Sequence, residues 1–144
     1  EHKGKIPRAG RMAFDEVLRQ ADFITLHCPL SPDTQHLISR RELELMKPSA
    51  YLINTARGGL VNEADLLACL TSGRIAGAAT DVVQGEPPDH DQPLLRQQPP
   101  NLIITPHIAW ASRESRQRLL DQLAGNIENF FQYKPFNQIT DALS

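Results

Sequence analysis

The sequence has 144 residues, which is enough for one domain with a hydrophobic core of ordinary size. Its hydrophobic content of 40% and charged content of 22% are typical of a globular protein and exclude a disordered or fibrous chain. The net charge of −2 gives no basic excess for nucleic-acid binding, and no uninterrupted apolar run is long enough to span a bilayer. We therefore expect neither a nucleic-acid partner nor a membrane partner.

Patterns typical of helices and strands alternate along the chain. Apolar residues at helical spacing predict the helices, and short apolar runs bounded by turn residues predict the strands. In chain order, we expect a helix over 12–21, a strand over 22–30, a helix over 39–46, a strand over 49–56, a helix over 62–73, strands over 75–83 and 101–108, and a helix over 112–134. The proline-rich stretch 84–100 is predicted to be a long loop.

Two of the predicted helices begin with capping signals. Ser39 and Glu42 form the S-x-x-E capping box, and Asn62 with Asp65 has the same reciprocal spacing. The last helix is recognised by its apolar side, which we expect to pack on neighbouring elements. That side consists of Leu119, Leu120, Leu123, Ile127 and Phe130 or Phe131.

The alternation, with strands that are apolar on both faces, predicts an α/β fold with a Rossmann-like parallel sheet covered by helices. In such sheets, ligands bind beyond the carboxyl ends of the strands. The residues directly after the predicted strands are therefore the candidate site residues. They are 27–29, 55–57, Asp81 and 105–107, to which the loop after the third strand adds Glu86.

Four of these candidates are an arginine, a histidine and two carboxylates. Taken singly, Arg57 also fits a surface charge, and Asp81 also fits a turn residue. His107 also fits a core histidine, and Glu86 fits an ordinary loop acid. Their shared place at one edge of a sheet favours a common function instead.

An arginine, a histidine and a carboxylate suit the reduction of a 2-keto acid. Arginine grips a carboxylate with two parallel hydrogen bonds, and histidine, with an ordinary pKa of about 6.5, exchanges protons near neutral pH. A carboxylate on the second ring nitrogen fixes the tautomer and stabilises the imidazolium. Because no side chain supplies hydride, this chemistry also requires a nicotinamide cofactor.

Longer stretches of the sequence resemble a known family. The stretches are "ADFITLHCPLSPDTQHLI", "MKPSAYLINTARGGLVNEADLLACLTSGRIAGAATDV", "EPP" and "NLIITPHIAWAS". They resemble the C-terminal half of the D-isomer-specific 2-hydroxyacid dehydrogenases, over roughly residues 12–133. "TPHIAWAS" and "EHKG" are most similar to the branch of glycerate dehydrogenases, also called hydroxypyruvate reductases. The resemblance implies an NAD(P)-dependent oxidoreductase that acts on a small 2-keto or 2-hydroxy acid, with hydroxypyruvate/glycerate or glyoxylate/glycolate as the expected pairs.

The resemblance also implies a catalytic role for three residues. Arg57 of "NTARGG" matches the arginine that binds the carboxylate and carbonyl of the keto acid. His107 of "TPHIA" matches the acid/base that protonates the carbonyl oxygen. Glu86 of "GEPP" matches the acid that forms a hydrogen bond with that histidine.

Further matches concern the cofactor, which is expected to be NAD or NADP. Asp81 matches a residue that contacts the nicotinamide amide, and Trp110 lies where the family's backbone also contacts it. The positions expected to line the cofactor are Cys28, Pro29, Thr55 and Ala56, together with Arg57. Glu1 is a candidate for the acid that binds the adenosine ribose, which leaves the choice between NADH and NADPH open.

Two parts of a complete enzyme of this family are missing from the sequence. It contains no G-x-G-x-x-G turn for the pyrophosphate, and no separate substrate domain. We therefore interpret residues 1–144 as the C-terminal part of a dinucleotide-binding domain from a longer protein. The strand at 22–28 would then form a bare apolar edge, which predicts a homodimer or another partner at this edge. We expect the chain alone to bind dinucleotide poorly and to be inactive.

The remaining expectations concern compartment, metals and an alternative function. Cys28 and Cys69 have no CxxC pairing and lie in apolar contexts, which predicts buried free thiols in a reducing compartment, the cytoplasm. "DHD" at 89–91 has no partner at ligand spacing, so no metal site is expected. A dinucleotide-sensing, corepressor-like protein of the same fold with little turnover is the alternative to an enzyme.

Overall fold

The structure is a computed structural model that describes residues 10–134 and 136–138. The chain divides into two compact units, Glu1–His107 and Ile108–Ser144. The first unit contains the sheet and most of the helices, and the second contains one long helix.

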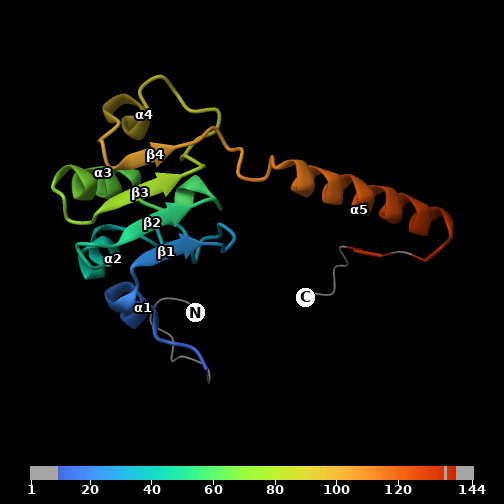
Figure 1. Ribbon diagram of the computed structural model, residues 1–144, viewed down its shortest axis with the longest axis horizontal. Coiled ribbons are helices and arrows are strands. Elements are labelled where there is room, and N and C mark those ends of the chain that lie inside the picture. Colours follow the sequence, from blue (N-terminus) through green and yellow to red (C-terminus); the bar gives the residue numbers. More distant parts are fainter. Residues whose placement is uncertain (1–9, 135, 139–144) are drawn as a thin grey trace. The chain divides into compact units, whose positions relative to one another are not determined.

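Four strands form the parallel sheet of the first unit. They are β1 (Phe23–Leu26), β2 (Tyr51–Asn54), β3 (Gly77–Thr80) and β4 (Leu102–Ile104), and their order in the sheet is β1-β2-β3-β4. Neighbouring strands are all parallel, so their arrowheads point toward one edge of the sheet (Figure 1). The predicted parallel α/β sheet is confirmed, and β1 lies at its edge as expected.

One helix precedes the first strand of this sheet, and further helices connect the successive strands. The elements are α1 (Phe14–Gln20), α2 (Arg40–Leu45), the short 3-10 helix η1 (Gly58–Leu60), α3 (Glu63–Thr71) and α4 (Pro93–Gln97). The capping signals act as predicted: the Ser39 N–H donates to Glu42 Oε2 at 3.1 Å, and the Asp65 N–H donates to Asn62 Oδ1 at 3.1 Å. These caps satisfy donors that the first turn of a helix leaves without an internal partner.

The stretch 84–100 is not a continuous loop, because it contains α4. Gln92 caps this helix by accepting a hydrogen bond from the Leu95 N–H at 3.0 Å, and Pro93 occupies the first turn. Proline is favoured at that position, since its missing N–H has no helical partner there in any case. Leu94, which is 1% exposed, anchors the helix in the core. The high proline content of the stretch concealed this short helix.

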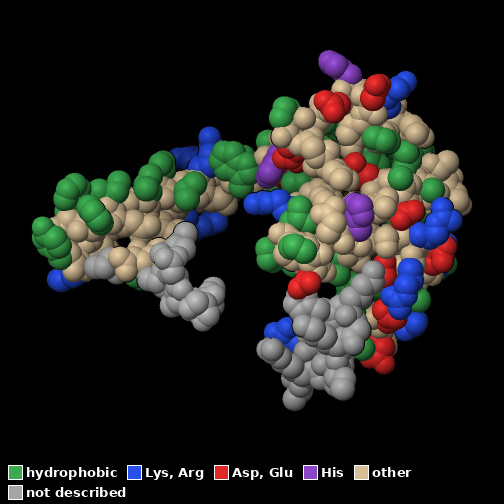
Figure 2. Space-filling model, turned by 180° about the vertical axis from the view of Figure 1, so that it is seen from behind, with side chains coloured by type: hydrophobic (Ala, Val, Ile, Leu, Met, Phe, Trp, Pro, Cys, Tyr) green, Lys and Arg blue, Asp and Glu red, His purple; other side chains and the backbone are tan. Residues whose placement is uncertain are grey.

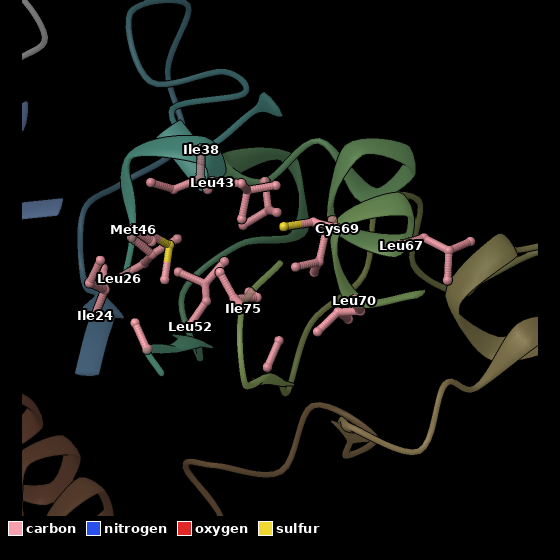
Figure 3. Packing of buried hydrophobic residues seen from close by; sticks show 14 of the residues in the cluster. Ile24, Leu26, Ile38, Leu43, Met46, Leu52, Leu67, Cys69, Leu70 and Ile75 are labelled. Atoms are coloured by element: carbon pink, nitrogen blue, oxygen red, sulfur yellow. The ribbon is translucent and has the colours of Figure 1, made fainter. Parts of the chain in front are cut away.

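The hydrophobic core lies between the sheet and its helices. Ile24 and Leu26 of β1 and Leu52 of β2 point to the same side, where they meet the helical residues that Figure 3 labels. Those helical and loop residues include Ile38, Leu43, Met46, Leu67, Cys69, Leu70 and Ile75. The core therefore fixes the strands, and with them the loops at the strand ends.

The connecting helices of the described first unit cover one face of the sheet, although apolar residues on both faces of the strands were expected to be covered. Strand order equals chain order, and right-handed crossovers then place every connecting helix on the same face. Along β1 the side chains alternate between exposed and buried. The other face carries Phe23, Tyr51 and Ile103, which are 67%, 44% and 66% exposed, and the rings of Phe23 and Tyr51 stack at 5.5 Å. The apolar residues of this face have no helix against them in the described first unit.

The second unit contains α5 (Arg113–Phe131). Ser112 caps this helix, because the Ser112 side chain accepts a hydrogen bond from the Ser115 N–H at 3.1 Å. None of the residues of α5 is buried, so its apolar side has no packing partner among the described residues of its own unit. Figure 2 shows hydrophobic side chains along this helix, whereas packing on neighbours was expected. Among the described residues, no helix has the length and apolarity needed to cross a membrane.

Candidate active site

The residues predicted after β2, β3 and β4 do lie together at the carboxyl ends of the strands, which we call the carboxyl edge of the sheet. Because the strands are parallel, their carboxyl ends meet there, and the chain leaves them at residues 55–57, 81–86 and 105–107 (Figure 1). Arg57, Glu86, Asp81 and His107 all belong to these exit segments of the first unit. Two neighbouring cavities open among them.

Glu86 and His107 form a close pair at this edge. Glu86 Oε2 lies 2.6 Å from His107 Nδ1, and Glu86 Oε1 accepts a hydrogen bond from the Val83 N–H at 3.0 Å. These two donors hold the pKa of the Glu86 carboxyl below its ordinary value, with the Val83 N–H as the larger cause. An ionised carboxylate only accepts hydrogen bonds, so His107 Nδ1 carries the proton in this contact.

The backbone of His107 is unusual, because its φ of 54° lies in the left-handed region. A residue with a Cβ is disfavoured there and stays only when the surroundings hold it. The His107 N–H donates to the Thr105 carbonyl oxygen at 3.0 Å, which closes a tight turn across Pro106. This turn aims the imidazole at the loop that carries Glu86.

Asp81 is the buried acid of the edge, with 3% of its surface exposed. Its backbone N–H donates to the Asn54 carbonyl oxygen at 2.9 Å, which continues the pairing of β2 with β3. Thr105 Oγ1 donates to Asp81 Oδ1 at 2.5 Å. The orientation of this carboxylate is therefore set by the strand that also leads to His107.

Arg57 lies at the end of β2, where a buried amide shapes the backbone. Asn54 is 3% exposed; its Oδ1 accepts from the Ala56 N–H at 3.1 Å, and its Nδ2 donates to the Arg57 carbonyl oxygen at 2.9 Å. These bonds fold residues 54–57 into a turn that holds the Arg57 side chain at the surface. The guanidinium donates from Nη1 to the Ala56 carbonyl oxygen at 2.6 Å.

The glycines that follow Arg57 permit a close approach of two backbone segments. A Cβ on Gly58 would meet the backbone of Val83 and would lie 2.5 Å from Gln84 N. Only a residue without a side chain fits against this loop. The loop that carries Glu86 thus packs directly on the turn that carries Arg57.

Two cavities flank Glu86. One, of about 260 Å³, is lined by Arg57, Gly58, Gly59, Leu30, Gln35 and the loop from Val82 to Glu86. The other, of about 430 Å³, is lined by Asp81, His107, Thr105, Leu95, Ile104 and Pro88, among others. Glu86 and Val83 border both, so the acid of the pair stands between the arginine and the histidine.

The other predicted positions have varied outcomes. Cys28, Pro29, Thr55 and Ala56 lie after β1 and β2 at the same edge, with Cys28 half-buried rather than buried. Both cysteines are free thiols, and Cys69 is buried in the core. Trp110 belongs to the second unit, so its place in the site stays a prediction. Glu1 lies outside the described residues.

Sequence reasoning missed Asn54, and it placed Thr105 among the residues after the strands without giving it a role. Asn54 and Thr105 make the hydrogen bonds that orient Arg57 and Asp81. The available signal was a polar residue at the end of an apolar strand, in "YLIN" and "LIIT". In the described part of the chain, no group of three or more His, Cys, Asp or Glu side chains could hold a metal ion.

A parallel sheet with charged residues beyond the carboxyl ends of its strands is typical of the α/β domains that bind ligands at this place. Residues 2–109 match the family described as "D-isomer specific 2-hydroxyacid dehydrogenase, NAD binding domain". The chain belongs to this family.

Curated relatives agree with this assignment. The chain is 52% identical over 133 residues to a glycerate dehydrogenase from Methylorubrum extorquens, with 92% of this chain and 42% of the relative covered. It is 45% identical over 125 residues to a hydroxypyruvate reductase from Blautia hydrogenotrophica, with 87% and 38% covered. The chain thus spans less than half the length of these relatives.

Solved structures show the same fold. The NAD-complexed D-isomer specific 2-hydroxyacid dehydrogenase from Lactobacillus delbrueckii ssp. bulgaricus matches with a TM-score of 0.79 and 34% identity, covering 90% of this chain and 43% of that chain. An acyclic imino acid reductase in complex with NADPH and D-Arg matches with a TM-score of 0.78 and 35% identity, covering 96% and 44%. Both nicotinamide cofactors are therefore represented among structures of this fold.

Proposed function

We propose that this chain is the catalytic edge of an NAD(P)-dependent dehydrogenase that interconverts a small 2-keto acid and its D-2-hydroxy acid. The observation that carries the proposal is the contact of 2.6 Å between Glu86 and His107, next to the cavity that Arg57 lines. A histidine with a carboxylate on Nδ1 is arranged to transfer a proton through Nε2. An arginine at the same edge supplies the charge that a keto-acid carboxylate requires.

In this mechanism each residue has one task. The Arg57 guanidinium binds the substrate carboxylate in two parallel hydrogen bonds and thereby orients the ketone. The His107 imidazolium, which Glu86 stabilises through Nδ1, donates its Nε2 proton to the carbonyl oxygen, and in the reverse direction the neutral ring takes this proton from the hydroxyl group. A bound nicotinamide supplies the hydride that the carbonyl carbon receives. The product is a hydroxyl group on the carbon that carried the ketone.

The residues of the edge fit the nicotinamide part of the cofactor. The Asp81 carboxylate is buried, and Thr105 holds one of its oxygens, so its orientation suits an acceptor for the amide NH₂ of the ring. Thr55 and Ala56 follow the neighbouring strand and would line the ring's surroundings. The pyrophosphate requires a glycine-rich turn that these 144 residues do not contain.

The substrate pairs that we propose are hydroxypyruvate with glycerate and glyoxylate with glycolate. The names of the relatives support them, because they include a glycerate dehydrogenase, a hydroxypyruvate reductase and glyoxylate reductases. All of these keto acids are short, which agrees with a cavity of about 260 Å³ beside Arg57.

The test is a chimera in which this chain replaces the matching 42% of the Methylorubrum extorquens glycerate dehydrogenase. We expect oxidation of NADH or NADPH when hydroxypyruvate or glyoxylate is added, and loss of this activity in the His107→Ala chimera. The Arg96→Ala chimera is the control, since Arg96 is a surface residue of α4. A folded chimera that is inactive with both keto acids and both cofactors would contradict the proposal.

A further inference from the structure

We propose that Glu63 is a positioning residue that holds the loop of Glu86 in the geometry needed for the Glu86–His107 pair, a role that rests on the function proposed above. Glu63 is the first residue of α3, and its carboxylate binds Gln84 and Gln92 rather than His107. Its influence passes through the backbone of the loop.

Both carboxylate oxygens of Glu63 bind the loop that carries Glu86. Oε1 accepts a hydrogen bond from the Gln84 N–H at 2.6 Å, and Oε2 accepts one from Gln92 Nε2 at 2.5 Å. Gln84 precedes Glu86 by two residues, and Gln92 follows it as the cap of α4. The loop is therefore fastened to α3 on both sides of Glu86.

The first of these bonds leads directly to the catalytic pair. The Gln84 N–H belongs to the residue next to Val83, whose own N–H donates to Glu86 Oε1 at 3.0 Å. The other oxygen of Glu86 contacts His107 Nδ1 at 2.6 Å. Consecutive N–H groups thus bind two different carboxylates, so a displacement of Gln84 also displaces the donor that orients Glu86.

A simpler role for Glu63 is to stabilise the start of α3. Acidic residues are favoured in the first turn, where they interact with the helix dipole and its unpaired N–H groups. However, Asn62 already caps this helix, and it is Asp65 that lies at the reciprocal position. Glu63 sends both oxygens away from the helix and toward the loop, which the capping role alone does not explain.

The partial burial of Glu63 agrees with a role in holding the loop by hydrogen bonds. Removal of the carboxyl from water raises its pKa, and the bonds from Gln84 and Gln92 counteract this effect. A partly desolvated carboxylate that loses these two donors is left with unsatisfied oxygens. The same two hydrogen bonds therefore hold the loop and provide partners for the oxygens of the Glu63 carboxylate.

The test measures the titration of the Glu86 carboxyl in the full chain by carbon-detected NMR. Removal of Glu63 in the Glu63→Ala variant frees Gln84, loosens the Val83 donor and raises the pKa of Glu86 toward its ordinary value. The matched control is Asp65→Ala, because Asp65 lies in the same first turn and also accepts a backbone N–H, but from Arg40 at 3.0 Å, which is not part of the loop. We expect Asp65→Ala to leave the pKa of Glu86 unchanged.

Two further variants keep the test decisive if Glu63→Ala does not fold. Glu63→Gln keeps an oxygen for the Gln84 N–H, so we expect the pKa of Glu86 to stay near its value in the unaltered chain. Glu63→Leu removes both acceptors while it keeps a side chain of similar size at this position of α3, so we expect the same rise in the pKa of Glu86 as in Glu63→Ala. If the pKa of Glu86 is unchanged in the variants that remove both acceptors, the proposed role of Glu63 is wrong.

Activity separates this inference from the proposed function. In the active chimera, Glu63→Ala should lower kcat about tenfold or more with a smaller change in KM, because proton transfer is sensitive to misplacement by about 1 Å. A raised pKa of Glu86 with unchanged kcat would support the fastening of the loop but contradict the use of Glu86 in catalysis. An unchanged pKa would contradict the fastening itself, whatever the activity.

Discussion

Replacement of Gly58 by alanine tests how closely the arginine turn packs on the loop of Glu86. The new Cβ would lie 2.5 Å from Gln84 N and would also meet the backbone of Val83. Ordinary contact begins at 3.4 Å, and the Val83 carbonyl atoms would lie closer still than Gln84 N, so the loop backbone would have to move by more than about 0.9 Å. No side-chain rotation relieves this overlap, because the opposing atoms all belong to the backbone.

The neighbouring glycine provides the matched control. A Cβ on Gly59 would meet the Leu30 side chain at 2.9 Å and Gln35 Oε1 at 3.2 Å, both of which are ends of side chains that can rotate. Overpacking of a well-packed site costs about 1–3 kcal/mol. We expect a loss of about 3 kcal/mol in the free energy of unfolding for Gly58→Ala and about 1 kcal/mol for Gly59→Ala.

The assay is urea unfolding followed by circular dichroism, with the free energies compared at equal m-values. The Gly58 variant should also lose the Val83–Glu86 bond, since a shift of this size exceeds the tolerance of a hydrogen bond. NMR should then show a raised pKa of Glu86 in Gly58→Ala and not in Gly59→Ala. Equal losses of stability in the two variants, or a larger loss for Gly59→Ala, would refute the packing described for this turn.

The remaining predictions concern acid stability, catalysis, thiol reactivity and assembly. The folded-state pKa of Glu86 is lowered, so the contribution of this carboxylate to stability is present above the ordinary glutamate pKa and is lost as the pH falls through the lowered value. In Glu86→Gln, the free energy of unfolding should therefore fall less steeply at acid pH. An unchanged dependence on acid pH would contradict the Glu86–His107 contact. In the active chimera, His107→Ala should reduce kcat by about 100-fold or more, whereas Arg57→Ala should mainly raise KM; a kcat within a few-fold of the unaltered chimera would contradict the proton transfer by His107. Burial raises the pKa of the Cys69 thiol, so iodoacetamide should modify the half-buried Cys28 first, as peptide mass spectrometry would show; the reverse order would place Cys69 nearer to solvent than the structure does. Sedimentation equilibrium checks the expected homodimer, and a monomer at all accessible concentrations would exclude it.

Much of the fold was predictable because the signals are local. Capping pairs such as Asn62 with Asp65 act within one turn, and the strands stand out as short apolar runs between turn residues. The parallel topology then follows from the alternation of the two patterns. The same topology predicts that Arg57, Asp81 and His107 share one edge, since parallel strands end together.

The errors arose where tertiary packing decides. The helix α4 has only five residues, and Leu94 holds it by insertion into the core, which no local pattern reveals. The apolar character of Phe23, Tyr51 and Ile103 indicated buried strands, but the direction of the crossovers leaves their face without helices in the described first unit. The sequence shows that these residues are apolar, but whether a helix covers them depends on the topology of the sheet.

The internal supports of the site were also beyond local reasoning. Thr105 binds Asp81 across 24 residues of sequence, and Glu63 binds Gln84 across 21. Hydrogen bonds of this kind depend on where separate loops meet after folding, and a single sequence contains no spacing rule for them. The candidate catalytic residues were visible because of their chemistry, whereas the residues that orient them are ordinary polar types.

The order of the strands has a consequence for how the site forms during folding. Each strand pairs with the strand that precedes it in the chain, as in Phe23 with Tyr51 and Tyr51 with Gly77. Partners are therefore separated by only about 25 residues, so each pairing closes a short loop and none has to wait for a distant segment. A chain that leaves the ribosome N-terminus first can add one strand after another to a growing sheet. Since β4 is the last of the four described strands in the chain, the Glu86–His107 pair forms only after β4 has joined the other three.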